Sequence, residues 1–201
     1  MSDFDARARE WDTPERQDRA LALAAVIREH VPLDASMRAI DIGAGTGLLG
    51  LALAGSVAEM VLAEPSGGML EVAQAKLASG AWPNVTALPF DLTADPPPGR
   101  PFDIAVSLLV LHHVADTLAA LSAVHALVAP GGRIALLDLD AEDGSFHDAD
   151  APGIHHQGFE RDHIVQLAAV AGFVDLETRT ATRIERDGRA YPLFLLTGRR
   201  G

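Results

Sequence analysis

Residues 39–50 read AIDIGAGTGLLG and combine one acidic side chain with three alternating glycines. Gly43, Gly45 and Gly47 lack a Cβ, so the backbone of this turn can approach a bound ligand closely. Asp41 stands two residues before the first glycine, where its carboxylate would attract an ammonium group and repel a pyrophosphate. These residues predict a strand that ends in a cofactor-binding turn.

The same stretch allows a second interpretation, because its last six residues, GTGLLG, match the GxGxxG pattern of dinucleotide-binding proteins. In that frame Gly43 and Ala44 would lie inside the strand, which glycine weakens. Asp41 would also face the pyrophosphate. We therefore favour the frame in which an acidic strand end precedes GxGxG. An NAD(P)-dependent oxidoreductase is the alternative, although the single tyrosine, Tyr191, has no lysine near it for a YxxxK pair.

A second acidic residue, Glu64 in VLAEPS, ends the next predicted strand. A carboxylate at that place accepts hydrogen bonds from vicinal ribose hydroxyls. The order of an acidic strand end, GxGxG and a second acidic strand end resembles the class I S-adenosylmethionine-dependent methyltransferases, in particular small bacterial members. The resemblance covers residues 38–140. It implies S-adenosylmethionine as cofactor, S-adenosylhomocysteine as product, and methyl transfer as the reaction.

The resemblance also assigns individual residues. Met69 would border the adenine, Asp91 would accept a hydrogen bond from its amino group, and backbone near Ser107 would line the cofactor. The opening FDARAREWD resembles a subgroup whose N-terminal segment closes over the cofactor, with Arg7 and Arg16 near its methionine end. The expected cofactor-binding residues are Asp41, Gly43, Ala44, Gly45, Gly47, Glu64, Pro65, Met69, Asp91, Leu92, Ser107, Leu108 and Trp11.

Four histidines are candidate catalytic residues. His112 and His113 follow a predicted strand, and His155 and His156 lie on a long polar stretch. Histidine titrates near neutral pH and can take a proton from a hydroxyl or amine acceptor, whereas a carbon or thiolate acceptor needs no such base. We expect at most one of His112 and His113 to face the site, because neighbours on extended backbone point in opposite directions. With His147, the loop histidines lack a firm metal-ligand spacing, and we predict no metal site.

The elements that position these residues alternate between strand-like and helix-like segments. This alternation predicts an α/β fold, here a Rossmann-like, seven-stranded, mostly parallel sheet with helices on both faces. Asp187-Gly188 predicts a turn that makes the C-terminal strands an antiparallel hairpin. We expect one domain over residues 1–201, with an N-terminal helical lid segment at 1–32 and the core at 33–201. The expected strands are 39–42, 57–63, 85–88, 102–107, 133–138, 173–184 and 190–198.

The composition of the chain limits the classes of molecule that it is expected to bind. The net charge of -12 disfavours binding to nucleic acid, and the absence of cysteine excludes disulfides and thiolate chemistry. The start of the chain lacks an apolar signal core, and no apolar stretch approaches the ~18 residues of a membrane helix. We expect a cytoplasmic monomer or homodimer that acts on a small molecule, without a membrane or nucleic-acid partner. A non-catalytic S-adenosylmethionine-binding module remains a second alternative.

Overall fold

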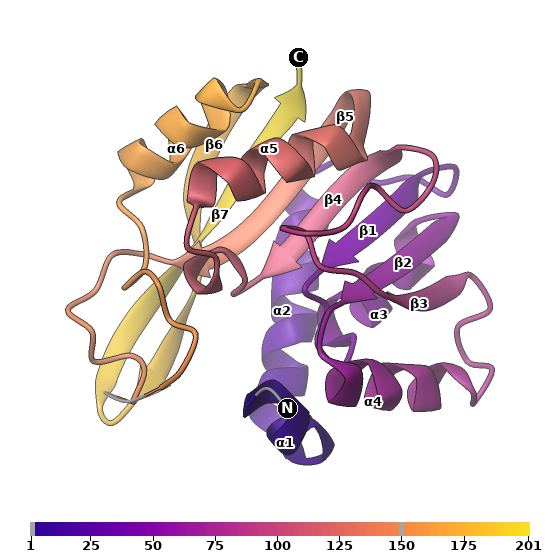
Figure 1. Ribbon diagram of the computed structural model, residues 1–201, viewed down its shortest axis with the longest axis horizontal. Helices are drawn as coiled ribbons and strands as arrows, with labels where there is room; N and C mark the ends of the chain where they lie inside the picture. The colour runs from indigo at the N-terminus through magenta and orange to yellow at the C-terminus, as the bar shows by residue number, and fades with distance from the viewer. Residues whose placement is uncertain (1–2, 149–150) are drawn as a thin grey trace.

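The sheet that carries the site is complete within the part of the chain that the computed structural model describes, residues 3–148 and 151–201. Met1 and Ser2 of the predicted lid segment lie outside that part. Seven described strands follow the order β3-β2-β1-β4-β5-β7-β6 (Figure 1). Their bounds are β1 Arg38–Ile42, β2 Glu59–Glu64, β3 Val85–Pro89, β4 Phe102–Leu108, β5 Val128–Leu139, β6 Phe173–Arg186 and β7 Arg189–Arg200.

The pairing of the strands confirms the predicted architecture. Strands β1 to β5 pair in parallel, and β7 runs antiparallel to both β5 and β6. Asp187 and Gly188 both have positive φ, 53° and 76°, as the tight turn between β6 and β7 requires. Strand β5 begins earlier than predicted, at Val128, because this residue pairs with Phe102 across a register shift.

Helices cover both faces of the sheet. Helices α5 and α6 lie in front of the strands in Figure 1, and α2 and α3 lie behind them. Buried residues of α2, α3 and α4 pack in one apolar cluster, and those of α5 and α6 pack in another on the opposite face. The helices are α1 Asp3–Arg7, α2 Pro14–His30, α3 Leu48–Leu53, α4 Gly67–Leu77, α5 Thr117–Leu127 and α6 Arg161–Val170, with 3-10 turns at Ala8–Glu10, Ala54–Ser56 and Leu111–His113.

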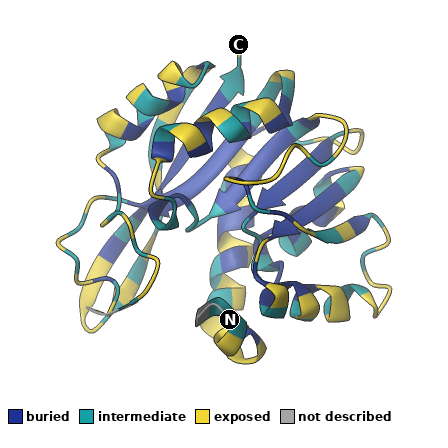
Figure 2. Ribbon diagram, in the orientation of Figure 1, coloured by how far each residue is buried: buried dark blue, intermediate teal, exposed yellow. Residues whose placement is uncertain are grey.

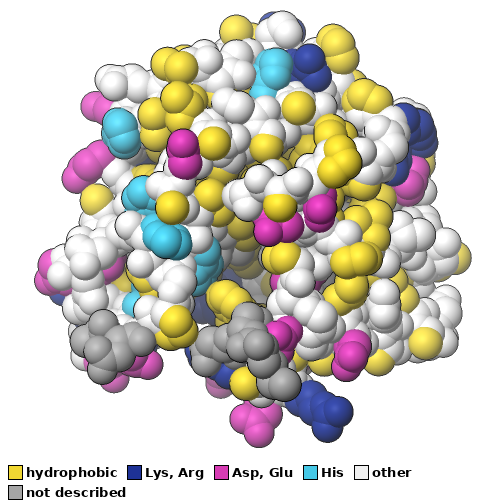
Figure 3. All heavy atoms as spheres, viewed as in Figure 1, with side chains coloured by type: hydrophobic (Ala, Val, Ile, Leu, Met, Phe, Trp, Pro, Cys, Tyr) yellow, Lys and Arg dark blue, Asp and Glu magenta, His cyan; other side chains and the backbone are white. Residues whose placement is uncertain are grey.

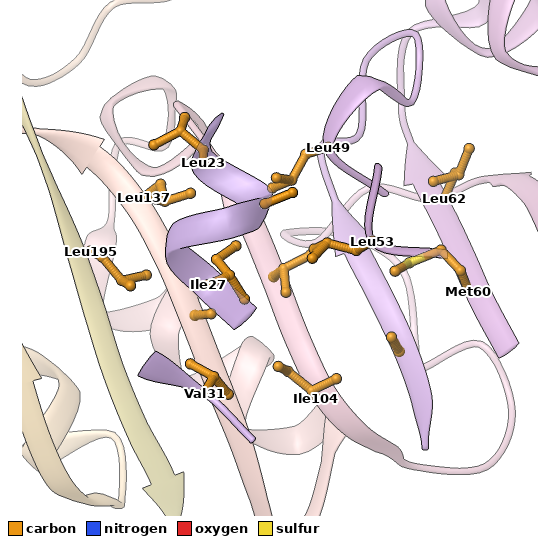
Figure 4. Close-up of a cluster of buried hydrophobic side chains, with 14 of the residues drawn as sticks. Leu23, Ile27, Val31, Leu49, Leu53, Met60, Leu62, Ile104, Leu137 and Leu195 are labelled. Atoms are coloured by element: carbon orange, nitrogen blue, oxygen red, sulfur yellow. The ribbon is translucent and has the colours of Figure 1, made fainter. Parts of the chain in front are cut away.

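Helix α2 is fixed to the sheet by one apolar face. Leu23 and Ile27 are four residues apart on the helix and therefore point the same way, and Val31 follows as the extended residue that caps its end. They pack against Leu137 of β5 and Leu195 of β7 (Figure 4). Each fully buried side chain of this size stabilises the fold by about 1.5–3 kcal/mol. This packing holds the polar N-terminal turns of α2 at the edge of the sheet where the parallel strands end.

Side-chain caps set where the helices start. Thr13 accepts a hydrogen bond from the backbone N of Arg16 (3.4 Å), with Pro14 as the first helical residue. Ser66 and Asp116 cap α4 and α5 in the same way. Ser66 lies just beyond the carboxyl end of β2, and Asp116 follows the 3-10 turn that comes after β4.

The β6–β7 hairpin and the long loop before α6 extend beyond the part of the sheet that the helices cover. The central strands are buried along their length, while the far end of the β6–β7 hairpin carries many exposed residues (Figure 2). The loop between Leu139 and Arg161 runs beside this end, held at its base by a bridge between Asp140 and Phe159. It is the long polar connection that the sequence predicts.

Candidate active site

The glycine turn after β1 requires glycine for two reasons. Gly43, Gly45 and Gly47 have φ values of 61°, 57° and 87°, a region that other residues rarely adopt. A Cβ on Gly43 would lie 2.6 Å from Cγ2 of Val110, which is closer than such atoms approach. Strand β1 ends at Ile42, so Gly43 and Ala44 lie beyond it, as the GxGxG frame predicts.

Asp41 lies at the end of β1 and is 1% exposed. Its Oδ2 accepts a hydrogen bond from the backbone N of Gly50 (2.8 Å) in the helix that follows the turn. Burial raises the pKa of Asp41 to about 7, against the effect of the Gly50 hydrogen bond and helped by the nearby Glu64 carboxylate. A cation bound nearby would relieve this cost, since it would stabilise the ionised carboxylate.

Glu64 joins the turns that follow β1 and β2. Its Oε2 accepts from the backbone N of Gly45 (2.7 Å) and its Oε1 from that of Ser66 (2.8 Å). Burial raises the pKa of this carboxyl, and the two backbone hydrogen bonds oppose that rise. Each carboxylate oxygen has a further lone pair, so Glu64 can hold the turns and accept from ligand hydroxyls together.

Residues 3–13, here called the N-terminal segment, are fastened across this edge of the sheet. Oδ1 of Asp5 accepts from Oγ of Ser66 (2.6 Å) and from the backbone N of Gly68 (3.0 Å) at the start of α4. Asp12 accepts a hydrogen bond from the hydroxyl of Thr46 in the glycine turn and forms an ion pair with Lys76 of α4. No local pattern in the sequence signals these pairings.

Trp11 holds two arginines against the glycine turn. The guanidinium of Arg16 lies 4.1 Å from the centre of the Trp11 ring, and that of Arg7 lies 5.5 Å from it. Nη1 of Arg16 also donates to the backbone O of Trp11 (2.9 Å). The indole Nε1 is the nearest atom that a Cβ on Gly45 would meet, at 3.9 Å. The N-terminal segment thus covers the turn.

These elements enclose a cavity of about 770 Å³. It is lined by the N-terminal segment, the start of α2, the glycine turn, the turns after β2 and β4, the loop residues around His147 and Ile154, and the end of β6. Figure 3 shows histidine side chains gathered beside a hollow in this face. Of the predicted site residues, the cavity is lined by Trp11, Asp41, Gly43, Ala44, Gly45, Glu64, Pro65, Met69, Leu108, His112 and His113.

Four predicted cofactor residues do not line the cavity. Gly47 is the N-cap of α3 and packs towards Leu62. The Asp91 carboxylate accepts hydrogen bonds from the backbone N and Oγ1 of Thr93, within its own turn (2.8 and 2.7 Å). Leu92 packs in the core beneath α5, and Ser107 is buried within β4. The motif predicts where these residues fall along the chain but not which of them face the cavity.

The expectation for His112 and His113 is wrong, because both line the cavity. Leu109 adopts a left-handed conformation after β4 (φ 59°), and Leu111–His113 form a 3-10 turn instead of extended backbone. On such a turn, neighbouring side chains are about 120° apart instead of opposite, so both rings can border one cavity. The two rings lie 4.1 Å apart, centre to centre. Nδ1 of His113 donates to the backbone O of Gly153 (2.8 Å).

The histidines of the loop are also placed differently from the prediction. His155 is exposed, and neither it nor His156 lines the cavity. Nε2 of His156 lies 3.2 Å from the hydroxyl of Thr117 and 3.0 Å from the backbone O of Val114, so this ring fastens the loop to the start of α5. His147 does line the cavity, with its ring 5.0 Å from that of His112.

Comparison with known proteins places this geometry in a family. Residues 15–178 match the model of a methyltransferase domain. The chain belongs to this methyltransferase domain family. It is similar to an uncharacterized methyltransferase of Mycobacterium tuberculosis, with 33% identity over 113 residues, which cover 56% of this chain and 55% of that protein.

Two further methyltransferase relatives extend the comparison. A ubiquinone biosynthesis O-methyltransferase of Azotobacter vinelandii is 31% identical over 140 residues, which are 67% of this chain and 60% of that protein. The chain thus spans less than two thirds of the length of these curated relatives. The crystal structure of a SAM dependent methyltransferase from Aquifex aeolicus has the same fold, with a TM-score of 0.72, 17% identity and 98% of each chain covered.

Among residues 3–148 and 151–201, no group of three or more metal-ligating side chains is placed to hold a metal ion. Over the same residues, no helix combines the length and apolar character that a membrane span needs.

Proposed function

We propose that this protein transfers a methyl group from S-adenosylmethionine to a small-molecule acceptor. The observation that carries the proposal is the meeting of Asp41, the glycine turn and Glu64 at one cavity. The two acids come from the ends of neighbouring parallel strands, and the turn between them leaves room for a ligand to approach the backbone.

The residues present fit this cofactor. Asp41 is a buried carboxylate with a raised pKa, which favours an ammonium group beside it. Glu64 keeps free lone pairs for the ribose hydroxyls, and Met69 contributes an apolar wall. When bound, S-adenosylmethionine supplies a methyl group on a positively charged sulfur. The NAD(P) alternative would instead set a pyrophosphate against the Asp41 carboxylate.

The enclosure of the cavity supports a small acceptor. A volume of about 770 Å³ lies within the range of small-molecule sites, roughly 300–1,000 Å³. The N-terminal segment on one side and the loop around His147 on the other limit access for a macromolecule. Enclosure also excludes water and aligns the reacting groups, which are the main contributions an enzyme makes to such a displacement.

Calorimetry with S-adenosylmethionine, S-adenosylhomocysteine and NADH tests the cofactor. We expect micromolar binding of the first two and none of NADH. Binding of NADH alone would favour the oxidoreductase alternative and overturn the proposal. Release of S-adenosylhomocysteine in the presence of a panel of small phenols, carboxylic acids and amines then tests transfer. Tight cofactor binding without transfer to any physiological acceptor would favour the non-catalytic module.

A further inference from the structure

The wall of the cavity contains a buried histidine–aspartate pair. Nδ1 of His112 lies 2.7 Å from Oδ1 of Asp138, and both side chains are 1% exposed. Asp138 is the last residue but one of β5, next to the strand that His112 follows. The same carboxylate accepts from the backbone N of Leu139 (2.8 Å) and of His112 (3.3 Å). The carboxylate is thus held in place from three directions.

This contact determines which ring nitrogen of His112 is free. A carboxylate only accepts hydrogen bonds, so Nδ1 of the neutral ring carries the proton and donates it to Asp138. Nε2 then holds a lone pair. In the described part of the chain, Nε2 is buried and has no hydrogen-bond partner. A buried nitrogen without a partner is costly, and such atoms occur where a ligand or a reaction supplies the partner.

Among the described residues, the other two histidines of the cavity make no hydrogen bond to a carboxylate, although Nε2 of His147 is also buried without a partner. His113 donates to a neutral backbone carbonyl, and burial lowers its pKa. Burial lowers the pKa of His147 to about 4, with the neighbouring histidines adding to that effect. Protonation of any of the three would create a buried cation. Of these rings, His112 is the one hydrogen-bonded to a carboxylate, whereas Glu142 acts on His147 and Asp138 acts on His113 without a hydrogen bond.

We propose that His112 is the general base of the reaction, that Asp138 positions it, and that the acceptor is a neutral hydroxyl such as a phenol. This inference rests on the proposed function and names its substrate class. A protonated amine would bring a second positive charge beside the sulfonium, whereas a neutral hydroxyl does not. A carbon or thiolate acceptor would leave the free nitrogen of His112 without a role.

The step balances in atoms and charge. The O–H bond of the acceptor breaks, its proton joins Nε2 of His112, and an electron pair of the oxygen forms the new bond to the methyl carbon. The bond from that carbon to sulfur breaks, and its electrons stay on sulfur as a neutral thioether. The positive charge lost at sulfur is then on the His112 imidazolium, beside Asp138. The products are a methyl ether and S-adenosylhomocysteine.

Nitrogen-15 NMR of histidine-labelled protein with bound S-adenosylhomocysteine tests the pair without an acceptor. We expect the neutral ring of His112 to carry its proton on Nδ1, and the Asp138→Asn substitution to change that tautomer. The groups that face His112 are Asp138 on β5, His113 on its own turn and His147 on the loop, with Glu142 and Arg186 near His147. A proton on Nε2 in the wild-type protein would overturn the proposal.

Methyl transfer to two phenols of different acidity tests the base directly. At pH 7.5, 4-methylphenol is neutral and 4-nitrophenol is largely ionised. His112→Gln should slow transfer to the neutral phenol by about 100-fold or more and transfer to the ionised one by less than about 10-fold. Asp138→Asn should act in the same direction and alter the pH profile. Equal losses with both phenols would show that His112 has no role as a base.

Two controls separate this inference from the proposed function. The substitution His163→Gln, at an exposed histidine of α6, should leave transfer unchanged. Binding of S-adenosylhomocysteine should stay within about threefold of wild type in all three variants. If the wild-type protein did not bind S-adenosylhomocysteine, the proposed function itself would be overturned. If His112→Gln does not fold, the NMR measurement on the wild type still decides the inference.

Discussion

Replacement of Asp41 by Asn should stabilise the protein in the absence of cofactor and weaken cofactor binding. In the folded protein the pKa of Asp41 is raised from 3.8 to about 7, so the unfolded chain ionises first as the pH rises. The fold therefore loses stability with rising pH between roughly pH 4 and 7, by about 1.4 kcal/mol per pH unit. The total cost of the ionised carboxylate is about 4 kcal/mol.

Asparagine removes this cost, but its neutral amide oxygen accepts the hydrogen bond from the backbone N–H of Gly50 less strongly than a carboxylate does. A weaker hydrogen bond there costs about 1 kcal/mol. The net gain above pH 7 is then about 2–3 kcal/mol, or roughly 5–10 °C in Tm for a domain of this size. Because one ionisation gives the whole pH dependence, the variant should be about 1 kcal/mol less stable than wild type near pH 4, where only the weaker hydrogen bond counts, and should reach its full gain above pH 7.

Thermal unfolding of ligand-free protein at several pH values, with calorimetry of S-adenosylmethionine binding, measures both effects. We expect Asp41→Asn to bind the cofactor about 10-fold or more weakly at pH 8, since a charge-assisted contact is lost. The exposed Asp18→Asn on α2 is the matched control and should change neither quantity. A variant that is less stable than wild type at pH 8, or a stability difference that does not vary with pH, would refute the reasoning.

Three further substitutions test other parts of the site. Gly43→Ala places a Cβ against Val110 on left-handed backbone, whereas the Cβ of Gly188→Ala meets nothing within 4 Å at a similar φ. The free energy of unfolding should fall by about 1–2 kcal/mol in Gly188→Ala and by more in Gly43→Ala. Equal losses in the two variants would exclude the steric effect. Glu64→Gln should weaken S-adenosylmethionine binding about 10-fold by calorimetry, and unchanged affinity would remove Glu64 from the cofactor site. His156→Gln should lower the free energy of unfolding by about 1 kcal/mol and leave cofactor affinity unchanged, and a large loss of affinity would contradict its structural role.

The features that the sequence predicts well are those fixed by local physics. The glycines after β1 and the acids that end β1 and β2 stand in a short motif whose spacing follows from strand and turn geometry. The hairpin turn at Asp187-Gly188 has a similarly local signature, because few other residue pairs adopt two successive positive φ values. The parallel order of β1 to β5 follows from the alternation of strands and helices.

The features that it misses depend on contacts between distant segments. His147 lines the cavity and His156 does not, because the path of the loop is set by packing against α5 and the hairpin. The left-handed Leu109 turns the chain after β4 and brings two adjacent histidines to one side. Asp138 had a usable signal, since it is the acid that ends the predicted strand 133–138, as Asp41 and Glu64 stand at the ends of theirs.

The fastening of the N-terminal segment has a consequence for the timing of ligand exchange. A cofactor seated on the glycine turn lies beneath Trp11, and Asp5 and Asp12 tie the segment to α4 and the turn. Departure of the spent cofactor then requires these polar contacts to break, although no bond of the ligand itself changes. Residence time would then depend on the contacts of the N-terminal segment, which salt weakens, and it could vary independently of the chemistry at the strand ends.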